Sequence, residues 1–326
     1  MNYEEFTEQY IAKLKEEFSE EAEITKQSIT KVNEKVEGIP VKYPDMALTP
    51  VIYLKEKFEM YEEGYSMEQI VAESKEQMDK AYANSPKAYF GAIKDFKVEN
   101  FYCAVINAEK NEELLENVPH QKVADLAVIA RYKVDEDTSF MVTNGFCRYL
   151  KMTKDEVFEK AFKNLENESF KCENMAYTVK KLLQGDGQPD EYIDELIEMQ
   201  AKECPIYVLS NDKLIDGAVA IASRKAMEEA YELVKQEHPE MKDMIIIGSS
   251  RHELLLIPDT VVENMEDLKQ MHKMVQCEEV RNEDRLSENI YRIDEETKQL
   301  SIVNTEALSI EESFAEDVTI SHARSH

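Results

Sequence analysis

The stretch Met244–Asp259, MIIIGSSRHELLLIPD, decides the fold that we predict for this chain. Two intensely apolar runs flank a short polar segment, a pattern typical of two buried strands joined as a hairpin. Gly248 gives the backbone freedom at the turn, and the serines after it can bond to nearby amides. We therefore expect a hairpin that fixes a sheet in the C-terminal part of the chain.

The polar residues of this stretch, Ser249, Ser250, His252 and Glu253, are also candidates for a catalytic site. A serine beside a histidine that is held by a carboxylate is the arrangement that activates a nucleophile. The stretch has no G-x-S-x-G elbow, however, and Leu256 stands where H-E-x-x-H requires a second histidine. Strand alternation also places His252 and Glu253 on opposite faces. We expect a structural turn, with a hydrolase or metal-dependent enzyme as the alternative.

A weaker metal hypothesis concerns His120 and Asp125, in the segment VPHQKVAD. Together with His252 and Glu253 they would form a nitrogen and oxygen set that suits zinc or manganese, provided that the strands are neighbours. A histidine after a proline is more often a loop residue. The chain has neither G-x-G-x-x-G nor G-K-[ST], so we expect no nucleotide cofactor, and no other cofactor is indicated.

The rest of the chain predicts an α+β protein. Apolar residues at helical spacing run from Tyr3 to Phe18 and continue more weakly to Val36, which indicates a helical arm. From Phe96 the pattern changes to short β-rich runs, one of which is interrupted by Arg131. Strands and helices cluster rather than alternate, which favours a helical N-terminal region followed by a mixed, largely antiparallel sheet flanked by helices. We predict a helical arm and region over 1–92, a sheet domain over 93–303 and a disordered acidic tail over 304–326.

Composition limits the partners. The 68 acidic residues exceed the 39 basic ones and give a formal charge of −29. This charge argues against direct binding of nucleic acid or anionic membranes and leaves basic proteins or cationic molecules as partners. The five cysteines form no C-x-x-C pair, and Cys147 has a cation beside it, Arg148, that would lower a thiol pKa. An acidic N-terminus and the lack of 18 consecutive apolar residues indicate neither export nor membrane insertion, so we expect a cytoplasmic protein.

One predicted helix carries a dense acidic face, formed by Asp190, Glu191, Asp194, Glu195 and Glu198. Carboxylates spaced along a rigid rod can occupy a groove that normally holds phosphates, and such a face could block a basic, nucleic-acid-binding protein. A solvated surface is the commoner role of such a face.

Four blocks of sequence resemble, in the same order, a domain-of-unknown-function family of gut Gram-positive bacteria that is often encoded near mobile elements. The blocks are TPVIYLKEKFEMYEEGYSMEQIV, VPHQKVADLAVIARYKV, PIYVLSN followed by GAVAIA, and SSRHELLLIPD. The likeness covers most of residues 48 to 303 and implies one family-length unit in a bacterial cytoplasm. It carries over no active site, and Gly248 stands where the family pattern has a proline.

Three functions remain open at this point. The leading one is a non-catalytic acidic interaction protein, a mobile-element-encoded inhibitor that mimics nucleic acid against a basic host protein such as a defence nuclease. The second is a hydrolase or metal-dependent enzyme that uses the serine and histidine turn. The third is a small-ligand sensor with a groove beside the sheet.

Overall fold

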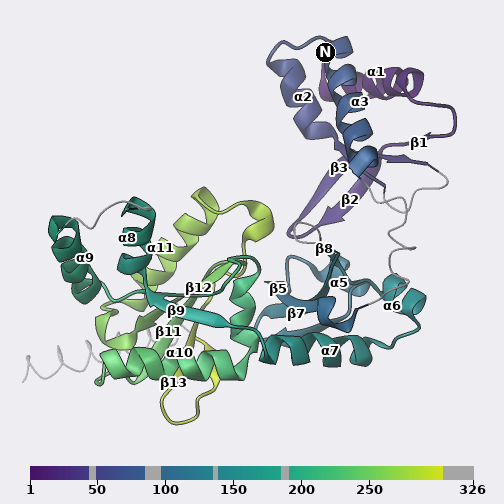
Figure 1. Cartoon of the computed structure of the whole chain (residues 1–326). Helices are drawn as coiled ribbons and strands as arrows, with labels where there is room; N and C mark the ends of the chain where they lie inside the picture. Colours follow the sequence, from purple (N-terminus) through teal and green to yellow (C-terminus); the bar gives the residue numbers. More distant parts are fainter. Residues whose placement is uncertain (44–48, 85–96, 135–138, 185–190, 304–326) are drawn as a thin grey trace, which may run out of the picture. The chain divides into compact units, whose positions relative to one another are not determined.

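The chain divides into an N-terminal unit, residues 1–98, and a C-terminal unit, residues 99–326. The structure, a computed structural model, describes residues 1–43, 49–84, 97–134, 139–184 and 191–303 (Figure 1). The predicted domain boundary after residue 92, the acidic turn at 135–138 and the predicted acidic tail at 304–326 lie outside the described residues.

The N-terminal unit combines helices with a small sheet (Figure 1). Its elements are α1 (Tyr3–Glu17), β1 (Glu23–Ile24), β2 (Gln27–Lys31), β3 (Glu34–Lys42), β4 (Val51–Tyr53), α2 (Leu54–Glu62) and α3 (Met67–Asn84). All the strand pairs are antiparallel, with β3 pairing to β1, β2 and β4. Aromatic side chains of α1 and α2 build its core, where Phe6 lies 5.4 Å from both Tyr10 and Phe58 between ring centroids.

The helical arm is shorter than predicted. It ends at Glu17, and the weaker apolar pattern up to Val36 belongs to the β2–β3 hairpin instead. The segment from Ile29 to Val32 is rich in β-branched residues, which favour strands. Asn33 adopts φ 64° at the turn, a left-handed conformation that asparagine tolerates and a continuing helix does not allow.

The C-terminal unit contains two antiparallel sheets. Its first elements are η2 (Val98–Asn100) at the unit boundary, β5 (Phe101–Asn107), α5 (Glu112–Glu116), β6 (His120–Val123), β7 (Leu126–Lys133), β8 (Ser139–Met141), α6 (Asn144–Leu150) and α7 (Lys154–Glu166). The second half comprises β9 (Phe170–Asn174), α8 (Met175–Gln184), α9 (Glu191–Glu203), β10 (Tyr207–Asn211), η3 (Gly217–Ala222), α10 (Arg224–Glu237), β11 (Asp243–Ser250), β12 (Glu253–Pro258), η4 (Asp259–Val261), α11 (Met265–Glu278), η5 (Asn282–Asp284), β13 (Ile290–Asp294) and β14 (Leu300–Ile302).

In the smaller sheet, β7 lies between β5 and β6 and also pairs with β8. The larger sheet has the order β14-β13-β11-β12-β10-β9. Met265 and Leu268 of α11 pack against Ile245 and Ile247, so this helix covers one face of the larger sheet. Sheets and helices together confirm the predicted α+β class.

The hairpin in Met244–Asp259 is confirmed, but its turn is not where Gly248 suggests. Ser250 pairs with Glu253, so Arg251 and His252 form the turn. The register shifts between Ile247 and Ser250, which makes the glycine segment a β-bulge that bends the strand before the turn. The bulge and the short turn together place Arg251 and His252 at the end of two central strands of the larger sheet.

Candidate functional site

A cavity of about 680 Å³ opens in the C-terminal unit where the smaller sheet and α7 meet the loop after β10. Strands β5, β7 and β8 supply one wall, and the loop after β10 with the β11–β12 turn supplies the other. Its lining includes Glu99, Tyr102, Arg131, Lys133, Ser139, Asn164, Glu168, Ser169, Asn211, Asp212, Lys213, Asp216 and Arg251. Polar and charged residues therefore dominate this cavity, unlike the apolar core around it.

The loop after β10 holds Asp216 in an unusual backbone conformation. Asn211 organises this loop, because its side chain accepts hydrogen bonds from the amides of Lys213 (3.2 Å) and Ile215 (3.3 Å) and donates to the Ile215 carbonyl (2.9 Å). Asp216 has φ 55° and ψ 21°, and its side chain is 3% exposed. Non-glycine residues in this region carry strain and cluster at functional sites.

Gly217 allows the loop to approach the β11–β12 turn. A Cβ atom at this position would lie 2.2 Å from Ser210 Oγ and 2.5 Å from the His252 carbonyl oxygen. Only glycine fits at such distances, so the DG pair at 216 and 217 determines where the Asp216 carboxylate lies.

Two arginines from different sheets lie on either side of that carboxylate. Arg131 Nε, on β7, is 3.7 Å from Asp216 Oδ2, and Arg251 Nε, in the β11–β12 turn, is 3.4 Å from Asp216 Oδ1. Arg131 also donates to the Tyr102 hydroxyl (2.8 Å) and to Ser139 Oγ (2.9 Å). Arg251 has a second carboxylate partner, Asp284, at 3.0 Å.

This charge cluster is held by attraction more than by aligned hydrogen bonds. Among the described residues, neither Asp216 Oδ1 nor Arg251 Nε has a hydrogen-bond partner, although both atoms are buried. Buried polar atoms are nearly always hydrogen-bonded, and an exception requires an explanation. The two arginine side chains are less buried than the aspartate between them, with exposures of 16% for Arg131 and 25% for Arg251.

Glu168 adds a titratable group to the same cavity. Burial raises the pKa of its carboxyl, and the nearby Asp216 charge acts in the same direction. Asn211 Nδ2 donates to Glu168 Oε1 at 2.9 Å, which partly offsets the effect of burial on this pKa. Burial also raises the pKa of Tyr102. Burial therefore disfavours the charged form of each group.

The structure does not bring the predicted turn residues together as a nucleophile and base. Ser250 Oγ donates to Glu253 Oε1 (2.8 Å) and accepts from the His252 backbone amide (3.0 Å). The His252 ring contacts aspartates instead, because the Asp216 amide donates to Nδ1 (3.3 Å) and Nε2 lies 3.3 Å from Asp284. This pattern places the ring proton on Nε2. The carbonyl of Ser249 accepts a hydrogen bond from Gln276.

His120 and Asp125 line a separate hollow of about 350 Å³. His120 Nδ1 lies 3.0 Å from the Val118 carbonyl oxygen. The Asp125 carboxylate accepts hydrogen bonds from Tyr291 (2.7 Å), Asn289 (3.0 Å) and Ser287, which tie the β6–β7 turn to the segment that begins β13. Within the described ranges, no group of three or more histidine, cysteine, aspartate or glutamate side chains is arranged to hold a metal ion.

The acidic helix face is described only in part. Asp190 and the side chain of Glu191 lie outside the described residues. Asp194 pairs with Lys180 at 2.7 Å, whereas Glu195 and Glu198 are exposed on α9.

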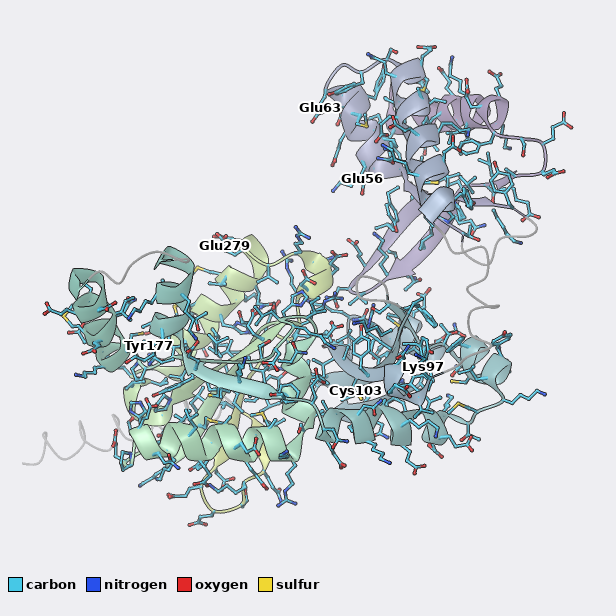
Figure 2. All side chains as sticks on the ribbon, in the orientation of Figure 1. Glu56, Glu63, Lys97, Cys103, Tyr177 and Glu279 are labelled. Atoms are coloured by element: carbon cyan, nitrogen blue, oxygen red, sulfur yellow. The ribbon has the colours of Figure 1, made fainter. Side chains whose placement is uncertain are left out.

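All five cysteines are free thiols. Cys103, on β5 (Figure 2), is buried, and burial raises its pKa to about 12. Burial also raises the pKa of Cys147, and this effect outweighs the opposite influence of Lys154 and Arg148. The neighbouring arginine therefore does not make Cys147 a reactive thiolate.

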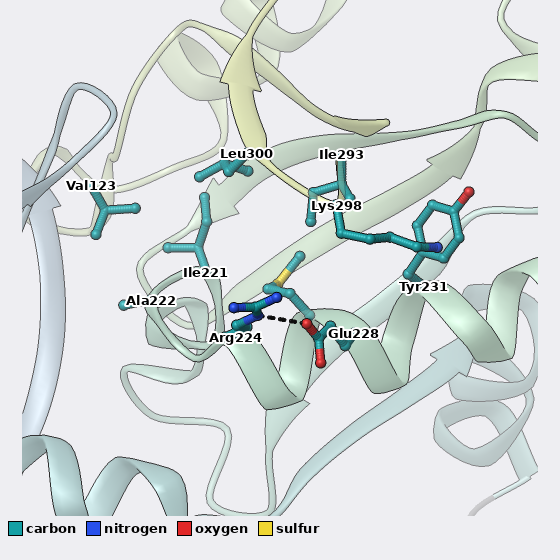
Figure 3. A pocket seen from close by; sticks show the side chains of 10 residues that line it. Val123, Ile221, Ala222, Arg224, Glu228, Tyr231, Ile293, Lys298 and Leu300 are labelled. Carbon is teal, nitrogen blue, oxygen red and sulfur yellow. Dashed lines mark hydrogen bonds and ion pairs between the residues drawn. The ribbon is translucent and has the colours of Figure 1, made fainter. Parts of the chain in front are cut away.

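A smaller cavity of about 240 Å³ lies beside α10 (Figure 3). Apolar side chains such as Ile221 and Ile293 line it. The two cations at this cavity are already engaged, since Arg224 pairs with Glu228 (2.7 Å) and Lys298 Nζ lies 3.3 Å from the Tyr231 ring centroid. It is a shallow apolar depression, and the larger cavity is the better candidate site.

The sequence indicated only part of this site. Arg131 was visible as a charge inside an apolar strand, which is unusual unless the charge has a partner. The roles of Tyr102, Asp216 and Asp284 were missed, because their partners come from distant segments. Asp216 followed by Gly217, the first residue of GAVAIA, was the available signal for a tight turn with an unusual backbone conformation.

Sequence comparison matches residues 3–295 to the model of a family described as a family of unknown function, DUF5688. Comparison with curated proteins and with solved structures gives no match. Across the described parts of the chain, no helix combines the length and apolar character needed to cross a membrane.

Proposed function

The chain belongs to the DUF5688 family of unknown function, whose membership specifies no activity, and from the cavity itself we propose that the C-terminal unit binds a small molecule. It would then act as a small-ligand sensor, one of the three functions left open by the sequence. The single observation that carries this proposal is the buried Asp216, held in left-handed backbone at the cavity wall with an oxygen that no described residue hydrogen-bonds.

Three properties of the cavity support ligand binding. Its volume of about 680 Å³ falls in the range of roughly 300–1,000 Å³ typical of small-molecule sites. Its polar groups converge from both sheets, as in sites that fix a ligand's orientation. Asp216 lies in left-handed backbone, and non-glycine residues in this conformation are common at binding sites.

Tryptophan fluorescence offers a direct test, because the chain contains no tryptophan. Ser169→Trp places a reporter at an exposed position on the cavity lining, and Tyr149→Trp places one at an exposed position outside it. A panel of polar metabolites should change the emission of the first variant only. The same ligands should raise the melting temperature of the unsubstituted chain, because a ligand that binds only the folded state stabilises it. If no compound of the panel does either, the proposal fails.

The acidic surface supports a second candidate function, a non-catalytic interaction protein. The net charge of −29 and the exposed Glu195 and Glu198 on α9 suit contact with a basic protein. In the most specific form of this proposal, the chain is a mobile-element-encoded inhibitor that mimics nucleic acid against a nucleic-acid-handling host protein.

This second candidate predicts a salt-sensitive complex with a basic partner. The triple variant Asp190→Ser, Asp194→Ser, Glu198→Ser should abolish that complex, whereas Glu278→Ser, Glu279→Ser on α11 should retain it. Unchanged binding by the first variant would refute the role of the acidic face. We also propose a cytoplasmic location, which the five free cysteines favour.

A further inference from the structure

The cavity is more basic than the rest of the chain. Its lining holds four basic residues (Arg131, Lys133, Lys213, Arg251) and four acidic ones (Glu99, Glu168, Asp212, Asp216), whereas the whole chain has 39 basic and 68 acidic residues. One of the four acids, Asp212, is already paired with Lys171 (2.6 Å), which lies outside the lining. The lining thus lacks the excess of acidic over basic residues that the chain has as a whole.

The arginines are placed to contact a ligand. Asp216 lies between them and is almost fully buried, so the more exposed part of this cluster consists of the two arginine side chains. Arg131 is fixed by Tyr102 and Ser139, which reduces the entropy that it would lose on binding. A guanidinium presents several N–H donors in a plane and binds carboxylate or phosphate oxygens in pairs.

We infer that the cavity binds a small anion bearing a carboxylate or phosphate group, which Arg131 and Arg251 hold directly and for which Asp216 is a positioning residue. This inference rests on the proposed function, since it names the ligand class of the same cavity.

Calorimetric titration of the full chain at constant ionic strength tests the inference. The probes are inorganic phosphate, succinate and succinamide, the neutral counterpart of succinate. At least one of the two anions should bind, and succinamide should bind at least about tenfold more weakly than the anion that binds, the loss expected for one charge-assisted hydrogen bond. Binding of phosphate alone or of succinate alone identifies which anionic group the cavity accepts.

Arginine variants locate the site. Arg131→Gln and Arg251→Gln should each weaken anion binding about tenfold or more. Arg224→Gln, a highly exposed arginine paired with Glu228 outside the cavity, should change it less than about twofold and is the matched control. Arg131→Lys keeps the positive charge that Asp216 requires and remains informative if Arg131→Gln does not fold. This variant should still bind the anion more weakly than the unsubstituted chain, because lysine lacks the planar guanidinium group.

The outcomes separate the inference from the proposed function. If succinamide binds as well as the anions, or if both arginine variants bind like the control, the inference is overturned. If neither anion binds while a neutral or cationic compound of the metabolite panel does, the inference is also overturned and the small-molecule site stands. If no compound binds at all, both fail.

Discussion

Asp216→Asn should destabilise the C-terminal unit by about 3 kcal/mol, the lower end of the range for breaking a buried ion pair. Asparagine has nearly the same shape and tolerates the left-handed backbone, so the substitution removes charge without adding strain. At 3.4 and 3.7 Å, and with an effective dielectric constant of about 20, each arginine pair has a gross attraction of about 4–5 kcal/mol. Partial solvation of the arginines and the remaining Asp284 contact of Arg251 reduce the net loss.

Urea denaturation followed by far-ultraviolet circular dichroism measures this change. Asp212→Asn is the matched control, because this aspartate lies in the same loop but is exposed and pairs with Lys171 at the surface. A surface pair of this kind contributes about 0–1 kcal/mol. If Asp216→Asn costs no more than the control, then Asp216 does not hold the two arginines, and the positioning role assigned to it is wrong.

Three further predictions concern this unit. Gly217→Ala should lower the free energy of unfolding by about 3 kcal/mol, the upper part of the range for overpacking, because the new Cβ would clash with Ser210 and the His252 backbone. An unchanged urea midpoint would contradict this prediction. Burial raises the folded-state pKa of Glu168 above its ordinary value of 4.5, so its contribution to stability falls as pH rises through the interval between the two values. Glu168→Gln should therefore be more stable than the unsubstituted chain at about pH 7, with a difference that vanishes below pH 4.5 in a melting-temperature series. Asn264→Ala should cost about 1 kcal/mol, because Asn264 accepts hydrogen bonds from the first amides of α11; urea denaturation with no change in midpoint would exclude this cap.

Local patterns predicted much of the fold. The hairpin in Met244–Asp259 and the helix that begins at Tyr3 both depend on neighbours in sequence, and the structure confirms them. The continuation of the first helix towards Val36 was wrong. The sparse apolar pattern in this segment is compatible with a helix or a strand. Its β-branched residues and the turn at Asn33 favour the hairpin.

The candidate site was less predictable because its contacts are non-local. Arg131, Asp216 and Arg251 come from three segments whose proximity depends on how the two sheets pack. Sequence alone drew attention to His252 and Ser250, which are adjacent in the chain. The tertiary structure gives them different partners: the serine bonds within the turn, and the histidine ring contacts Asp216 and Asp284. Adjacency in sequence was therefore a poor guide to which groups share a site.

The net negative charge of the chain repels anions, whereas the proposed site attracts them. This conflict determines which anions the site can select. A net charge of −29 repels anions from the protein as a whole, but in physiological salt this repulsion is screened beyond about 8 Å. Affinity must then come from contacts inside the cavity. Arg131 and Arg251 supply those contacts only because Asp216, itself acidic, holds them in place from the buried side. An anion that cannot align with the guanidinium planes gains little attraction to offset the repulsion, so the shape of the acidic group determines binding as well as its charge.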